Sequence, residues 1–197
     1  GTGMGIHNGY MYASSDEAVY RYPLPEGDQL LPDESQRTLI AGGFPQQNAH
    51  ATKSFALDNA GNLYVNVGAP SNACMEEART KGSPGQDPCP QLEWQAGIWR
   101  FDANTPAQQQ QEDATRYATG IRNAVAIAWN PITNGLFAMQ HGRDQFNQFF
   151  PELFTEEESA QLPSEEFLQI DEGDDFGWPY CYYDHTQNKK LLNPEYG

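Results

Sequence analysis

Three segments of the chain repeat one pattern of apolar and polar residues. Each segment starts with a short apolar run, turns at Gly and Asn residues, continues with a second apolar run and ends with a third. Hairpin turn residues between runs of β-branched and aromatic residues predict antiparallel strands. The strands are predicted at residues 5–9, 10–13 and 18–22, at residues 54–57, 63–67 and 97–101, and at residues 125–129, 136–139 and 167–170.

A repeated antiparallel unit is typical of the blades of a β-propeller, in which each blade buries its faces against its neighbours. We therefore predict an all-β fold whose four-stranded blades lie near residues 1–40, 41–115 and 116–197. Closed propellers have about four to eight blades, so three blades do not close a ring. The chain is accordingly expected to be part of a longer protein, because an open stack of three blades would be unstable by itself.

The composition favours short strands and tight turns, since the chain has 18 Gly and 14 Pro and 12% of its residues are aromatic. Only one helix is predicted, inside the loop 140–166. Thr155 is suited to cap a helix over Glu156–Leu162, and Glu158 completes a capping box with it.

The charge balance excludes two classes of partner. Eleven Lys and Arg residues against 27 Asp and Glu residues give a net charge of −16, the wrong sign for a phosphate backbone or an anionic bilayer. We therefore predict neither nucleic-acid binding nor membrane insertion, and no run of about 18 apolar residues suggests a membrane span. The chain opens at Gly1 without a basic and apolar leader, and we interpret it as a mature or excised piece.

Two polar segments carry no predicted chemistry. The run Gln108–Gln111 is expected to be a low-complexity connection on the surface. The acidic stretch Asp171–Asp175 lacks the alternating ligand spacing of a calcium-binding EF loop, so we interpret it as a solvated turn.

Cys74 and Cys89 bracket a loop that is rich in Gly, Pro and polar residues and has no strand pattern. A disulfide between them would restrain a segment with little else to hold it, and we predict that bond. It would indicate an oxidising compartment, whereas two free thiols or half of a metal site are the alternatives. Cys181 is left without a partner and is open to pairing beyond Gly197.

The candidate site residues stand at corresponding places in the repeats. His50 comes shortly before the first strand of the second repeat, and Arg122-Asn123 immediately before that of the third. His141-Gly142-Arg143 follows the second strand of the third repeat. In a propeller the innermost strands line the central channel, so these residues are expected to meet at one pocket. The alternative is that each is only a hydrogen bonder at the end of a strand.

Four runs carry a resemblance to a known family: His50–Lys53, Gly61–Gly68, Thr119–Asn123 and Asp175–Cys181. They are similar to the soluble, six-bladed quinoprotein sugar dehydrogenases, which use pyrroloquinoline quinone (PQQ), and most of all to the sorbosone dehydrogenase branch. The resemblance extends in order over roughly residues 1 to 185. It implies that the chain supplies about three of six blades.

The resemblance also implies a mechanism. His50 would be the general base that removes the hydroxyl proton of the sugar while a hydride passes to the quinone. Arg122 would stabilise the negative charge that grows on the quinone oxygen. Asn123 and His141 would bind the cofactor, and the backbone carbonyls of Gly142-Arg143 would hold a calcium ion.

Some features depart from the family. Ala49 stands where some members have an acid beside the base, and His141 stands where the glucose enzymes have a glutamine. In the family, basic residues that grip the cofactor carboxylates come from later blades. The implied partners are a sugar, either an aldose or a sorbosone-like compound, and an electron acceptor such as a cytochrome or a quinone. The implied location is extracellular or periplasmic.

Two other functions stay open at this point. A non-catalytic, sugar-binding propeller module would keep the blades and lose the base, and the presence of His50 with Arg122-Asn123 argues against it. A propeller hydrolase of the lactonase type would use carboxylates around a metal in the channel. Glu165 and Glu166 are its candidates, but their position near an outer strand favours a solvated or supporting role.

Overall fold

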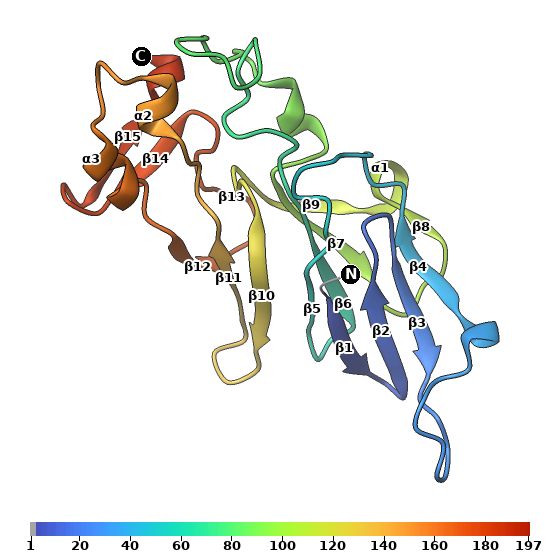
Figure 1. Ribbon diagram of the computed structural model, residues 1–197. Helices are drawn as coiled ribbons and strands as arrows, with labels where there is room; N and C mark the ends of the chain where they lie inside the picture. The colour runs from blue at the N-terminus through green and yellow to red at the C-terminus, as the bar shows by residue number, and fades with distance from the viewer. Residues whose placement is uncertain (1–2) are drawn as a thin grey trace.

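The computed structural model describes residues 3–197, so Gly1 and Thr2, at the start of the first predicted blade, lie outside it. Three sheets follow one another in chain order, from right to left in Figure 1. In the first sheet, four antiparallel strands are followed by a short fifth strand that pairs in parallel. Its strands, in spatial order, are β1 (Met4–His7), β2 (Tyr10–Ser14), β3 (Val19–Pro23), β4 (Thr38–Gly42) and β8 (Gln108–Gln109).

The second sheet has the same plan, with a short parallel strand added at its outer edge. In spatial order its strands are β5 (Phe55–Leu57), β6 (Asn62–Val67), β7 (Gly97–Asp102), β9 (Thr115–Thr119) and β13 (Asp174–Asp175).

The third sheet contains three antiparallel strands, and a separate hairpin, three helices and three short 3-10 turns complete the described residues. The sheet consists of β10 (Ala124–Asn130), β11 (Gly135–Gln140) and β12 (Glu166–Ile170), and the hairpin of β14 (Cys181–Asp184) and β15 (Lys189–Leu192). The helices are α1 (Gln110–Asp113), α2 (Phe146–Phe149) and α3 (Glu156–Gln161), and the 3-10 turns cover Glu34–Gln36, Pro90–Glu93 and Pro194–Tyr196. None of the helices in residues 3–197 is long and apolar enough to cross a membrane.

Alternation along β6 shows why the sheets stack. Leu63, Val65 and Val67 point to the first sheet, where they join a buried cluster with Tyr12. Tyr64, between them in sequence, joins a second buried cluster that reaches the third sheet. Because successive side chains of a strand face opposite sides of the sheet, the middle sheet is covered by apolar contacts on both faces.

The structure confirms the nine predicted strands and the predicted helix. Thr155 caps α3, and its side chain and that of Glu158 form both bonds of the capping box. Two expectations about sheets are corrected. The third sheet has three strands rather than four, and the acidic stretch is not only a turn, since Asp174–Asp175 pairs with β9 as strand β13.

The glutamine run is only in part a surface connection, which corrects a further expectation, since Gln111 is exposed and Gln109 half-buried. Gln108 and Gln110 are buried. The Gln108 amide donates to the carbonyls of Asp102 and Thr105 at 2.7 and 2.6 Å, and the Gln110 amide donates to that of Trp94 at 2.8 Å. Polar side chains can enter the interior when backbone groups satisfy them, and composition alone does not reveal such partners.

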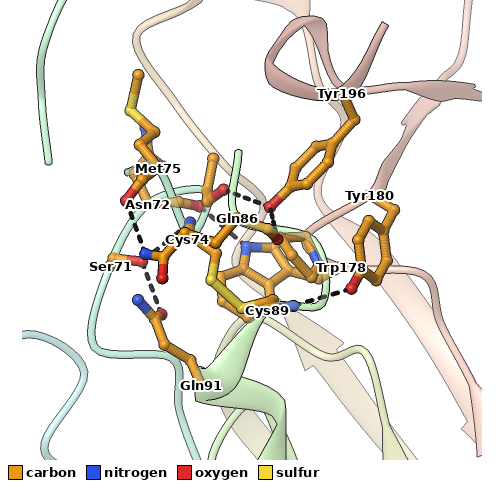
Figure 2. The surroundings of a disulfide bond; sticks show 12 residues. Ser71, Asn72, Cys74, Met75, Gln86, Cys89, Gln91, Trp178, Tyr180 and Tyr196 are labelled. Atoms are coloured by element: carbon orange, nitrogen blue, oxygen red, sulfur yellow. Dashed lines mark hydrogen bonds between the residues drawn. A yellow bond between two sulfur atoms is a disulfide. The ribbon is translucent and has the colours of Figure 1, made fainter. Parts of the chain in front are cut away.

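The predicted disulfide is present between Cys74 and Cys89, and Cys181 is a free, half-buried cysteine. The bond closes a long loop over residues 68–96, drawn in green in Figure 1. Around it, Trp178 packs against both cysteines in a small apolar cluster, and the Tyr180 hydroxyl accepts a hydrogen bond from the Cys89 amide at 3.1 Å (Figure 2). The disulfide therefore ties the loop to the C-terminal part of the chain.

Replacing both bonded cysteines, Cys74→Ser with Cys89→Ser, is expected to lower the free energy of unfolding. The two residues are 15 apart in sequence, and a cross-link of that span contributes about 3 kcal/mol by restricting the unfolded chain. Urea unfolding measures the loss, with Cys181→Ser as the matched control expected to change stability by less than about 1 kcal/mol. Equal stability of the double variant and the control would contradict the prediction.

Candidate functional site

Three of the predicted site residues, His50, Arg122 and His141, line one cavity of about 210 Å³. They come from the start of the second sheet, the start of the third sheet and the end of β11, respectively. Most of the remaining wall belongs to the loop 68–96, here called the disulfide-bonded loop. The remaining wall residues are Ala49, Pro70, Ser71, Asn72, Ala73, Met75, Ala78, Arg79 and Asp144.

The backbone around His50 is shaped by a close approach. His50 has a φ of 51°, in the left-handed region, and Gly68 lies against it. A Cβ on Gly68 would come within 2.7 Å of both the His50 Cβ and the Asn123 Oδ1, so a glycine is required there. The absence of a side chain at this point lets the histidine and the asparagine flank one strand end.

The tautomer of His50 follows from its hydrogen bond. Its Nδ1 lies 2.6 Å from the carbonyl oxygen of Ala69. A carbonyl only accepts hydrogen bonds, so Nδ1 carries the proton and Nε2 of the neutral ring has a free lone pair. Burial, and then the positive charge of Arg122, lower the pKa of His50 below its ordinary value of 6.5. At neutral pH the ring is therefore an uncharged base.

Arg122 is a buried cation, with 4% of its surface exposed. Its guanidinium donates to the carbonyl and side-chain oxygens of Asn72 at 3.2 and 3.0 Å, and to the carbonyl of His141 at 3.3 Å. Within residues 3–197 no carboxylate forms an ion pair with it. Burial lowers the pKa of Arg122 to about 10, so the group is still charged at pH 7.

Asn123 lies behind the cavity wall. Its Oδ1 accepts from the amide of Asn66 at 3.1 Å, and its carbonyl accepts from the backbone N–H of His141 at 2.8 Å. Asn66 is fully buried in β6, where it also accepts from the backbone of Ala124 at 3.0 Å. The two asparagines therefore join the second sheet to the third, next to Arg122 in the chain.

The segment 141–144 forms the opposite side of the site. His141 is exposed, and its Nδ1 lies 3.0 Å from Glu165 Oε1. Gly142 and Arg143 border a second, smaller cavity that also touches Arg122. The Arg143 side chain leaves the site and donates to both carboxylate oxygens of Glu195 at 2.6 Å.

The structure thus brings His50, Arg122 and His141 to one cavity and places Asn123, Gly142 and Arg143 in the layer next to it. Asn72 and Gln140, whose Oε1 accepts from the Arg122 N–H at 2.8 Å, were missed. Neither belongs to a recognisable motif. Asn66 could have been found, because a polar residue amid the apolar run of β6 signals a buried partner.

A protein-family model described as TrAA12-like matches residues 1–194. The chain belongs to the TrAA12-like family. No curated protein matches it. The family match, together with the solved structures below, confirms the resemblance to the quinoprotein sugar dehydrogenases.

Among solved structures, the chain is similar to a Trichoderma reesei carbohydrate-active enzyme of family AA12, with 20% identity and a TM-score of 0.70 over 92% of this chain and 44% of that one. It is similar to the PQQ domain of pyranose dehydrogenase from Coprinopsis cinerea, with 16% identity and a TM-score of 0.66 over 92% and 43%. A soluble aldose sugar dehydrogenase from Escherichia coli, in the apo form, gives 14% identity and a TM-score of 0.50 over 94% and 48%. The chain therefore spans less than half the length of each of these proteins.

Proposed function

We propose that the protein of which this chain is a part is a PQQ-dependent dehydrogenase that oxidises a sugar. The observation that carries the proposal is the pairing, in one cavity, of a neutral imidazole, His50, with a buried cation, Arg122, that forms no ion pair within residues 3–197. The oxidation of an alcohol needs a base to take the hydroxyl proton. It also needs a positive group nearby, because negative charge accumulates on the hydride acceptor. The PQQ domain among the structural neighbours supports this choice of cofactor.

The residues at the cavity fit an anionic quinone. Arg122 lacks a carboxylate partner within residues 3–197 and can pair with one supplied by a ligand. His141 lines the cavity. Asn66 holds the oxygen of the Asn123 amide, which leaves the NH₂ group of Asn123, in the layer next to the cavity, as a donor. When bound, the quinone would supply the hydride acceptor, while the protein would orient it.

We also propose that Gly142 and Arg143 would hold a calcium ion with their backbone carbonyls. No described residue donates a hydrogen bond to either carbonyl, so both fit the role of oxygen ligands. Residues 3–197 contain no cluster of three His, Cys, Asp or Glu side chains suited to a metal. The ion would therefore be held by backbone carbonyl oxygens and by the bound quinone. It would add positive charge beside Arg122.

His50 would act as the general base. Its Nδ1–H is held by the Ala69 carbonyl, so the ring is oriented with Nε2 available to accept the hydroxyl proton of the sugar. Arg122, fixed by Asn72 and His141, would remain charged throughout and stabilise negative charge that develops next to it.

We propose that the chain forms three blades of a six-bladed ring, and the exposed faces of the two outer sheets support the presence of further blades. On the first sheet Met4 and Ile6 are 77% and 69% exposed, and on the third sheet Phe167 is 67% exposed and stacks on Phe137. Apolar sheet faces of this kind are normally covered by another layer. Further blades, beyond this chain, would cover both.

Location and partners follow from the same proposal. The disulfide between Cys74 and Cys89 fits an extracellular or periplasmic protein. The substrate would be an aldose or a sorbosone-like sugar, and the electrons would pass to an acceptor such as a cytochrome or a quinone.

The alternatives have weaker support. The lactonase reading needs Glu165 and Glu166 to be free for a metal, but Glu165 pairs with His141, and Glu166 accepts from the Gln140 amide at 2.8 Å. A module that only binds sugar would have no use for a buried cation beside an oriented base.

Arg122→Ala is expected to weaken quinone binding by about tenfold or more, because a charge-assisted bond contributes about 1.5–3 kcal/mol. Titration of the whole protein with PQQ and calcium measures the affinity, and reduction of an artificial electron acceptor with an aldose measures the activity. Arg100→Ala is the matched control, since Arg100 pairs with Glu172 on the surface of the second sheet. Failure of the wild type to bind PQQ, or equal affinity of both variants, would contradict the proposed function.

A further inference from the structure

Asn72 lines the cavity and bonds to residues on two of its sides. It lies in the disulfide-bonded loop, two positions before Cys74, and Figure 2 shows it beside the bond and against Trp178. Asn72 is buried, with 7% of its surface exposed. A buried amide in an irregular loop is retained only where partners satisfy it, so its contacts indicate what it does.

Its first partner is the cation of the site. The Asn72 carbonyl accepts from Arg122 Nε at 3.2 Å, and the Asn72 side-chain oxygen accepts from Arg122 Nη2 at 3.0 Å. Two acceptors from one residue match the two N–H groups along one edge of the planar guanidinium, which fixes its orientation as well as its position. Both acceptors are neutral, so they hold the guanidinium without cancelling its charge.

Its second partner is the segment that follows β11. The Asn72 side chain accepts from the Asp144 N–H at 3.1 Å and donates to the Asp144 carbonyl at 2.8 Å. One amide group thus joins Arg122 to the segment 141–144, which carries His141 and the carbonyls of Gly142 and Arg143. A displacement of Asn72 would move both sides of the cavity.

Asn72 is itself held on each side. The Cys74 N–H donates to Ser71 Oγ at 3.0 Å, and Ser71 Oγ donates to Gln91 at 2.7 Å (Figure 2). Trp178 Nε1 donates to the Asn72 carbonyl at 2.9 Å. The disulfide, through Cys74, therefore restrains the backbone from which Asn72 reaches the site.

We propose that Asn72 is a positioning residue, which orients the Arg122 guanidinium for an anionic ligand and couples it to the segment 141–144. The proposal rests on the proposed function for the identity of that ligand, PQQ. It assigns to the disulfide-bonded loop a role in building the site as well as in stability.

The test compares three variants of the whole protein. Asn72→Ala removes the side-chain contacts and is expected to weaken PQQ binding by about tenfold and to speed hydrogen exchange at the Asp144 amide in the apo protein. Gln86→Ala is the matched control, because Gln86 lies in the same loop without lining the cavity, and its side chain donates only to the backbone carbonyl of Met75. It should match the wild type in both measurements.

Asn72→Asp separates position from charge. A carboxylate keeps the acceptor for Arg122 and for the Asp144 N–H but loses the donor to the Asp144 carbonyl, so protection of that amide should be restored in part. It also pairs with the Arg122 cation, so PQQ affinity should stay low. If Asn72→Ala does not fold, the test rests on Asn72→Asp alone. A PQQ affinity of Asn72→Asp equal to that of the wild type would overturn the proposal.

The outcomes distinguish the two proposals. If the wild type does not bind PQQ, the proposed function fails, and amide exchange of the apo protein still tests the coupling of Asn72 to the segment 141–144. If the wild type binds PQQ but Asn72→Ala matches Gln86→Ala in affinity and in exchange, Asn72 is not a positioning residue.

Discussion

His50→Ala should reduce sugar oxidation by about 100-fold or more, the usual contribution of a positioned general base. The ring is held by the Ala69 carbonyl at Nδ1 and faces the cavity, and its lowered pKa keeps it in the neutral form that can accept a proton. It is half-buried and belongs to none of the four apolar clusters, so its removal should leave folding nearly unchanged.

The measurement is reduction of an artificial electron acceptor by the reconstituted whole protein, alongside PQQ titration. His185→Ala is the control, because His185 is exposed in the turn between β14 and β15. Wild-type turnover in His50→Ala with PQQ bound normally would show that His50 is only a hydrogen bonder at a strand end.

The same assignment fixes a pH dependence. The base works only in its neutral form, and burial with the charge of Arg122 lowers its pKa below 6.5. As pH falls, protonation therefore sets in later than for a free imidazole, and the acid limb of kcat/KM should lie below pH 6.5. This limb should be absent from the residual activity of His50→Ala.

Glu195→Ala is expected to lower the free energy of unfolding by about 3–5 kcal/mol, the cost of leaving a buried charge unpaired. The Arg143 and Glu195 side chains are 1% and 0% exposed, and Nη1 of Arg143 lies 2.6 Å from both carboxylate oxygens. Burial raises the pKa of Glu195 in spite of the arginine, so desolvation outweighs the attraction between the two charges in setting that pKa. Without Glu195, the Arg143 cation would have only the face of Phe146, 4.2 Å away, and a backbone carbonyl.

Urea unfolding followed by tryptophan fluorescence measures the loss. Glu172→Ala is the matched control, since its ion pair with Arg100 is exposed and contributes less than about 1 kcal/mol. A loss in Glu195→Ala no larger than in the control would mean that the buried pair is dispensable. Because Arg143 belongs to the segment 141–144, the variant should also weaken PQQ binding.

Local features of the chain were predictable because their causes are local. The period-two alternation and the Gly and Asn turns specify the nine strands, such as Asn62–Val67, whatever the rest of the molecule does. The capping box at Thr155 and Glu158 lies within four residues and specifies its helix. The Cys74–Cys89 bond was predictable for a related reason, since one loop contains both cysteines and little else to hold it.

The buried polar contacts were decided by the tertiary structure. Asn72 lies 50 positions from Arg122 in sequence, and Arg143 lies 52 positions from Glu195. Such pairs form only when the sheets stack. From the sequence alone, each of the 27 Asp and Glu residues is an equally good candidate partner for Arg143. Gln108 shows the same limit, because its burial depends on carbonyls that another strand presents to it.

The sequence by itself therefore determined the strands, the order of the repeats and the residues able to do chemistry, since side-chain alternation, turn preference and acid–base character belong to single residues and their close neighbours. Only the tertiary structure decided which of those residues meet. It set His50, Arg122 and His141 around one cavity, and it joined Arg122 to the segment 141–144 through the Asn72 amide. The physical reason is that a buried hydrogen bond depends on geometry within tenths of an ångström, which apolar packing of whole sheets creates and no local pattern encodes.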